Sequence, residues 1–240
     1  MAGISAERQE TGFVNAVRNA LKITKKKPID IIAGDVILEN VVDADKYTGR
    51  QSSGAEPYTD IVVRPKNSKS INLSLKGESA PSLAGGGMKG LEEIVPGIAG
   101  KFMKAALKEL LNQGYKKGDK IPDVYGRITS RLKEKIVVGN QAMGGPIDYM
   151  YIGPMDVKAT FDEKRNALIL NGNLIESKQF AKTHDLYFRL RARREDQTFD
   201  PKAEKAGIPK IYGVSPSKGD SAGRIVITDS IPKEAIIVDV

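Results

Sequence analysis

Apolar side chains recur at two different spacings along this chain of 240 residues. Residues 6–24 carry them at helical spacing from Phe13 to Leu21, which predicts an amphipathic helix. Residues 29–38 favour a strand or two, interrupted at a Gly-Asp pair. Two short apolar segments within residues 58–76 flank a run of turn-forming residues, and this arrangement predicts a β-hairpin.

The rest of the chain predicts further helices and then a β-rich second half. Helical spacing indicates elements at 88–113, broken at Pro96-Gly97, and at 122–136. Candidate strands follow at 147–152, 155–161, 166–175, 185–193, 223–229 and 235–239. Polar stretches at 43–57 and 195–222 predict loops. We therefore expect an α/β (α+β) protein with a mixed central sheet and flanking helices.

The hairpin brings chemically useful residues together. If its turn centres near Lys66 and Asn67, Asp60 on the first strand lies opposite Ser74 on the second. Because side chains alternate along a strand, Ser74 and Lys76 project from the same face. The hairpin thus predicts a carboxylate and an ammonium on one face, which is half of a metal-dependent phosphodiesterase site.

Composition limits the chemistry of such a site. The chain has no cysteine and a single histidine, His184, which excludes thiolate catalysis and multi-histidine metal sites. Any metal must be bound by oxygen ligands, which favours Mg²⁺ or Mn²⁺. The net charge of +8 indicates a polyanionic partner. No apolar run or hydrophobic leader indicates a membrane, so we expect a cytoplasmic protein.

The hairpin residues resemble the motif of the PD-(D/E)XK nuclease superfamily, over roughly residues 5–115. The resemblance implies a restriction-endonuclease-like core in which Asp60 binds metal and Lys76 is catalytic. Ser74 stands where the family has an acid, and some members of the superfamily take that acid from a following helix. The residues that the resemblance then adds to the site are Glu92 or Glu93 as the second acid, Glu78 as a nearer candidate, Glu10 on the first helix and the Leu75 carbonyl as a metal ligand.

On this interpretation residues 1–140 form the nuclease-like core and residues 141–240 a β-rich extension packed on it. The implied activity is Mg²⁺- or Mn²⁺-dependent hydrolysis of nucleic acid, with DNA favoured over RNA. A phage origin would place the protein in the host cytoplasm or the virion. A homo-oligomer remains open.

Other positions predict contacts with nucleic acid. Alternation along 185–193 directs Arg189, Arg191 and Arg193 to one face, and arginine forks suit phosphate groups. The same face could instead be solvated and paired with nearby acids. The glycine-rich segment ending at Gly90 suits phosphate contact at a helix N-terminus, and Lys89 within it is a further candidate. A flexible connector is an equally good interpretation of this segment.

Two other functions remain open at the sequence level. One is a non-catalytic nucleic-acid-associated or virion structural protein with a nuclease-like core, favoured by the missing acid at Ser74. The other is a nucleotide-binding enzyme that uses the segment Gly85–Gly90, whose spacing matches G-x-G-x-x-G without the expected strand and acidic partner. The distinctive segment 143–148 matches no family motif.

Overall fold

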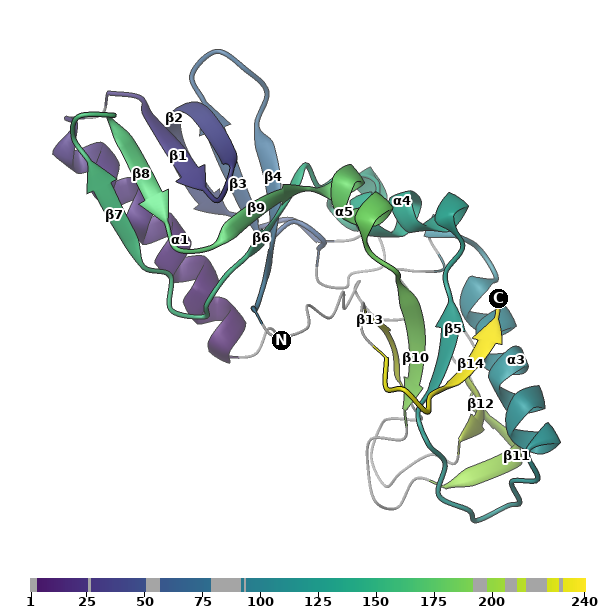
Figure 1. The fold of residues 1–240 in the computed structure, drawn as a ribbon. Coiled ribbons are helices and arrows are strands. Elements are labelled where there is room, and N and C mark those ends of the chain that lie inside the picture. The colour runs from purple at the N-terminus through teal and green to yellow at the C-terminus, as the bar shows by residue number, and fades with distance from the viewer. Residues whose placement is uncertain are drawn as a thin grey trace. The chain divides into compact units, whose positions relative to one another are not determined.

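The computed structural model gives a mixed α/β protein with a mixed sheet and flanking helices, as the sequence predicts (Figure 1). It describes residues 4–25, 27–50, 57–78, 92, 94–191, 198–205, 211–214, 224–228 and 231–240. The chain forms two compact units. The first comprises Met1–Pro81 and Val137–Phe180, and the second comprises Ser82–Ile136 and Ala181–Val240.

The first unit is built on an eight-stranded sheet in the order β7-β8-β1-β2-β3-β4-β6-β9. Its strands are β1 (Ile29–Ala33), β2 (Val36–Lys46), β3 (Ile61–Pro65), β4 (Ile71–Lys76), β6 (Tyr149–Ile152), β7 (Ala159–Asp162), β8 (Ala167–Leu170) and β9 (Asn173–Glu176). The pairs β1–β8 and β4–β6 are parallel, and the other neighbours are antiparallel. The predicted hairpin is confirmed as β3–β4.

Helix α1 (Ile4–Ile23) covers one face of this sheet, as Figure 1 shows. Phe13 and Val17 are fully buried on its inner side, as the helical spacing predicts. The Phe13 ring meets the Tyr151 ring edge-on, with centroids 5.4 Å apart. Burial of one such aromatic side chain is worth about 1.5–3 kcal/mol, so this contact secures the N-terminal half of α1 against β6.

The second unit contains a four-stranded sheet, β13-β10-β5-β14, and the two-stranded pair β11-β12. Its elements are α3 (Ile98–Asn112), β5 (Val124–Arg127), β10 (Tyr187–Arg191), β11 (Phe199–Lys205), β12 (Ile211–Val214), β13 (Arg224–Thr228) and β14 (Ile236–Asp239). The short 3-10 helix η1 (Gln141–Met143) lies in the first unit, whereas α4 (Ser130–Val138) and α5 (Ser177–Thr183) include residues of both units. A Cβ on Gly126 would come within 2.4 Å of the Phe102 ring, so glycine permits the close packing of α3 on β5.

Three sequence-based assignments are wrong. The helix predicted over 122–136 begins only at Ser130, because Val124 to Arg127 form β5. Residues four apart share a face in a strand as well as in a helix, which made this pattern ambiguous. Strand β2 continues to Lys46 into the predicted loop 43–57, and the predicted excursion 195–222 contains β11 and β12.

Among the described residues, no helix combines the length and the apolar character needed to cross a bilayer.

Tyr58 provides a test of packing in the first unit. It is 8% exposed, and its buried hydroxyl has no hydrogen-bond partner among the described residues. Burial raises the pKa of this hydroxyl, so it stays neutral. An unsatisfied buried hydroxyl costs about 1–3 kcal/mol. We therefore expect Tyr58→Phe to raise the free energy of unfolding by about 1 kcal/mol, measured by urea denaturation.

Tyr151→Phe is the matched control. The Tyr151 hydroxyl lies 3.5 Å from Asn171 Oδ1, so its removal should bring no gain in stability. Equal changes in the free energy of unfolding for the two substitutions would show that the buried Tyr58 hydroxyl does not destabilise the protein.

Candidate active site

The carboxylate of Asp60 ties the start of β3 to β4. Its Oδ2 atom accepts hydrogen bonds from the Leu75 backbone N–H at 2.6 Å and from the Ser74 hydroxyl at 3.1 Å. The pairing of Ile61 with Leu73 puts Asp60 opposite Ser74, as the sequence predicts. Ser74 is only 3% exposed, so its hydroxyl serves as a donor to Asp60 inside the protein.

The end of β4 is fixed against α1 through Gln9. The Gln9 side-chain amide donates to the Lys76 backbone carbonyl at 3.1 Å and to the Gly153 carbonyl at 3.0 Å. The amide is almost fully buried, and Gly153 N–H donates to the same Lys76 carbonyl. Gln9 therefore positions the backbone of Lys76 beside the first turns of α1. The sequence did not indicate this role, because Gln9 appears there only as one polar residue of an amphipathic helix.

Glu10 lies next along α1 and belongs to the same site. Its side chain is 18% exposed, and one carboxylate oxygen lies 3.4 Å from Lys46 Nζ. The pKa of Glu10 is raised, first because burial disfavours the charged form and then because the Asp60 charge repels it. The Lys46 ammonium opposes this rise but does not cancel it. The structure thus brings Glu10 and Asp60 into one electrostatic environment.

Lys46 is a site residue that the sequence did not indicate. It is the last residue of β2, two positions after the buried Ala44, and it therefore projects from the face that α1 covers. Its ammonium also donates to the Glu7 carbonyl at 3.4 Å. The sequence predicts a loop at residue 46, so no alternation argument orients its side chain toward Glu10.

The donor set of this site suits a hard divalent cation. Among the described residues there is no group of three or more Asp, Glu, His or Cys side chains placed so that it could hold a metal ion. Mg²⁺, however, commonly uses one or two carboxylates and completes its shell with water and substrate phosphate. Asp60 and Glu10 together would supply such a pair. The Leu75 N–H is engaged with Asp60, and a role for the Leu75 carbonyl in metal binding stays a prediction.

The other predicted acids occupy different positions. Glu92 belongs to the second unit, where its carboxylate accepts the backbone N–H groups of Gly97 at 2.5 Å and Ala99 at 2.8 Å. These bonds cap the N-terminus of α3. Glu78 is exposed just beyond β4, and burial together with its charge raises the pKa of Tyr151 to about 12. Glu93 lies outside the described residues.

The arginine row on β10 is engaged in part with protein. Arg189 Nε donates to Asp123 Oδ2 at 2.8 Å, and its guanidinium lies 5.8 Å from the centre of the Tyr125 ring. The side chain of Arg191, and all of Arg193 and Lys89, lie outside what the structure describes. A phosphate-binding role for these four residues stays a prediction.

The segment 143–148 supports the chain just before Asp60. The backbone N–H of Thr59 donates to the Gly144 carbonyl at 3.2 Å, and the Thr59 hydroxyl donates to the same oxygen. Gly144 has φ +71°, and a Cβ there would come within 2.6 Å of Pro57 Cβ. Glycine at this position therefore lets the segment approach residues 57–59 closely.

We expect Gly144→Ala to lower the free energy of unfolding by about 2 kcal/mol or more, because left-handed strain of about 1–2 kcal/mol adds to the clash with Pro57. Gly114→Ala is the control, since Gly114 has φ +86° with open space around its Cβ direction. Denaturation of both variants measures the difference. Equal losses would show that the contact with Pro57 is unimportant.

Glu10 should make stability depend on pH. Because its folded pKa is raised, the folded state holds this proton more tightly than the unfolded state does. Stability is therefore lost as pH rises from the unfolded value, about 4.5, through the folded pKa. We expect Glu10→Gln to be more stable than the wild type at pH 7 and similar to it near pH 4, measured by denaturation at both values.

Glu39→Gln, at an exposed position on β2, is the control and should leave the free energy of unfolding unchanged. A Glu10→Gln variant that is less stable at pH 7 would mean that Lys46 outweighs burial and Asp60.

Searches of protein-family models, of curated proteins and of solved structures found no match to this chain.

Proposed function

We propose that this protein is a metal-dependent nuclease that hydrolyses DNA phosphodiester bonds with the residues around Asp60. The observation that carries the proposal is the Asp60 carboxylate, which Ser74 and Leu75 hold just before β3. The Asp60 charge, together with burial, raises the pKa of Glu10 on α1, so this environment disfavours two negative charges. A divalent cation relieves that repulsion. The net charge of +8 supports a polyanionic substrate.

Asp60 and Glu10 would hold Mg²⁺ or Mn²⁺, which when bound supplies a Lewis acid and lowers the pKa of water. The hydrogen bonds from Ser74 and Leu75 fix the Asp60 carboxylate before any ligand arrives. Lys76, at the end of β4, would stabilise negative charge that develops on the phosphate. Lys46 balances Glu10 while no cation is bound.

A non-catalytic nucleic-acid-associated or virion structural protein is the second candidate. It is favoured by the use of Ser74 as a partner for Asp60 and by the absence of a third acidic ligand among the described residues. Such a protein would bind DNA but leave it intact when Mg²⁺ or Mn²⁺ is added.

Asp60→Asn should abolish cleavage of a labelled duplex in Mg²⁺ or Mn²⁺, because an amide is a poor metal ligand. Its oxygen can still accept from the Leu75 N–H, so the variant should fold. Lys76→Ala should lower kcat by about 10²–10³-fold, the usual loss when one electrostatic contact to the reacting group is removed. Calorimetric Mn²⁺ titration should show weaker binding to Asp60→Asn and Glu10→Gln.

Lys69→Ala serves as the control, because Lys69 is exposed in the β3–β4 turn. Its kcat should match the wild type. Cleavage by both site variants at the wild-type rate would remove Asp60 and Lys76 from the mechanism. Duplex binding without cleavage in either metal would favour the non-catalytic alternative.

A further inference from the structure

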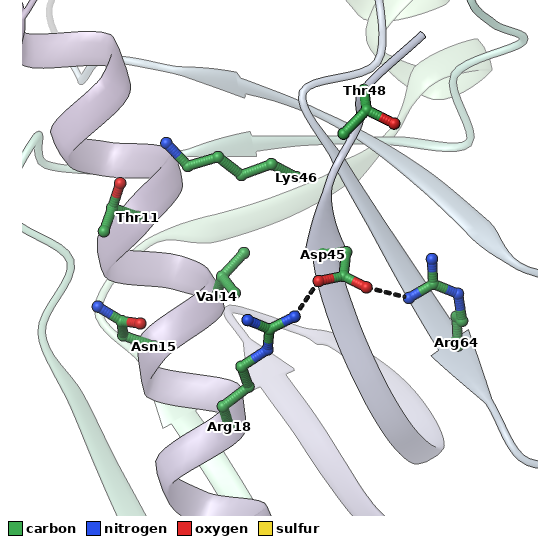
Figure 2. A pocket seen from close by; sticks show the side chains of 8 residues that line it. All are labelled: Thr11, Val14, Asn15, Arg18, Asp45, Lys46, Thr48 and Arg64. Atoms are coloured by element: carbon green, nitrogen blue, oxygen red, sulfur yellow. Dashed lines mark hydrogen bonds and ion pairs between the residues drawn. The ribbon is translucent and has the colours of Figure 1, made fainter.

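A cavity of about 500 Å³ opens in the first unit between α1 and strands β2 and β3 (Figure 2). Its volume lies in the range of small-ligand sites. The side chains that line it are Thr11, Val14, Asn15, Arg18, Asp45, Lys46, Thr48 and Arg64. Three of them are cationic and one is a carboxylate, and the Thr48 hydroxyl and the Asn15 amide supply further donor groups.

The two arginines are held in place by shared carboxylates. Figure 2 shows Asp45 between them: Arg18 donates to one of its oxygens, and Arg64 Nη1 donates to the other at 2.7 Å. Arg64 Nη1 also lies 3.0 Å from Asp43, and Arg18 Nε lies 3.8 Å from the same residue. The hydrogen bond from Arg64 lowers the pKa of Asp45, so the network is ionised at neutral pH.

These contacts use only part of each guanidinium. A guanidinium has five N–H donors in a planar fork. Among the described residues, none accepts a hydrogen bond from Arg18 Nη1, Arg64 Nε or Arg64 Nη2. Both side chains are more than two-fifths exposed. The fixed forks therefore keep donors available for a ligand with several acceptor oxygens.

The cavity adjoins the candidate active site through Lys46. The Lys46 side chain lines the cavity, and its ammonium also pairs with Glu10. Thr11, directly after Glu10 on α1, lines the same cavity. In Figure 2, Lys46 extends from β2 toward this helix. A ligand in the cavity would therefore lie one side chain away from the Glu10–Asp60 pair.

We propose that this cavity binds a phosphate group through Arg18, Arg64 and Lys46. Three acceptor oxygens and a negative charge suit two preformed guanidinium forks and an ammonium. The phosphate could belong to a DNA backbone or to a free phosphate compound. Its identification as a backbone phosphate beside the cleaved bond rests on the proposed function, whereas phosphate binding itself does not.

The test measures binding of a labelled duplex by anisotropy in EDTA, where no cleavage occurs, at several salt concentrations. Arg64→Gln and Arg18→Gln should each weaken binding about tenfold, as loss of a charge-assisted hydrogen bond does. If they hold one phosphate, each should reduce the slope of log K against log salt by up to about 0.9. Asp45→Asn should strengthen binding, because it removes a competing negative charge while the amide oxygen and Asp43 still hold the arginines.

Arg165→Gln and Asp162→Asn are the matched controls. Arg165 and Asp162 form an ion pair 3.7 Å apart where β7 turns into β8 in the same unit, with Arg165 exposed and Asp162 partly exposed. Their substitution should leave affinity unchanged. Circular dichroism confirms folding of each variant. Should an arginine variant unfold, Asp45→Asn still tests the proposal when circular dichroism shows that this variant is folded and Asp162→Asn shows no such gain.

A second arm titrates inorganic phosphate and follows it by ³¹P NMR. Phosphate binding that Arg64→Gln abolishes, without duplex binding, would support the cavity and assign it to free phosphate compounds. The expected duplex effects without any Mg²⁺-dependent cleavage would support the cavity and overturn the nuclease proposal alone. Unchanged affinity and salt slope in folded Arg18→Gln and Arg64→Gln, with no gain in Asp45→Asn, would overturn the phosphate site.

Discussion

The hydrogen bonds that Asp60 accepts are the interaction on which the candidate site depends. The Leu75 N–H and the Ser74 hydroxyl converge on one carboxylate oxygen, while the Asp60 backbone pairs with Leu73 and Tyr47 on either side. Hydrogen bonds to an ionised carboxylate are worth about 1.5–3 kcal/mol each. These contacts fix the position of the Asp60 carboxylate beside β2, β3 and β4. Its negative charge then contributes to the raised pKa of Glu10.

The support of Asp60 extends to a distant part of the sequence. Residues 143 and 144 accept hydrogen bonds from the backbone of Tyr58 and Thr59, and Asp148 accepts one from the Asn72 backbone. The segment 143–148 therefore contacts the two residues just before Asp60 and, on β4, Asn72, which lies two residues before Ser74. Gly144, in a segment that matches no family motif, has a structural explanation in this close packing.

Local patterns were sufficient to predict the hairpin and the buried face of the first helix. Alternation with period two put Asp60 opposite Ser74, and helical spacing predicted the apolar face from Phe13 to Leu21 that α1 buries. Both inferences involve residues close in sequence within one regular element. For the same reason the helices at 6–24 and near 98–112 were predictable, since their apolar faces are long and continuous.

Long-range pairing could not be predicted in the same way. The charged residues at the end of β2 resemble a loop in the sequence. They form a strand because residues remote in sequence balance their charges: Arg18 and Arg64 pair with Asp45, and Glu10 pairs with Lys46. Glu92 looked like a metal ligand, yet its carboxylate caps α3, and a capping acid and a catalytic acid have the same local sequence appearance. Ser74 looked like a vacancy in a metal site, and the structure shows it as a donor to Asp60.

The contacts of Lys46 link the candidate active site to the arginine cavity. Lys46 contacts Glu10 on one side and lines the arginine cavity on the other, so the charge of the acidic pair and the charge of the cavity are coupled through one ammonium. A cation beside Glu10 would compete with Lys46 for that carboxylate and free the ammonium for an anion in the cavity. An anion in the cavity would likewise draw Lys46 away from Glu10 and favour a cation there. By linkage the two effects are equal in free energy, so cation and phosphate would each strengthen binding of the other.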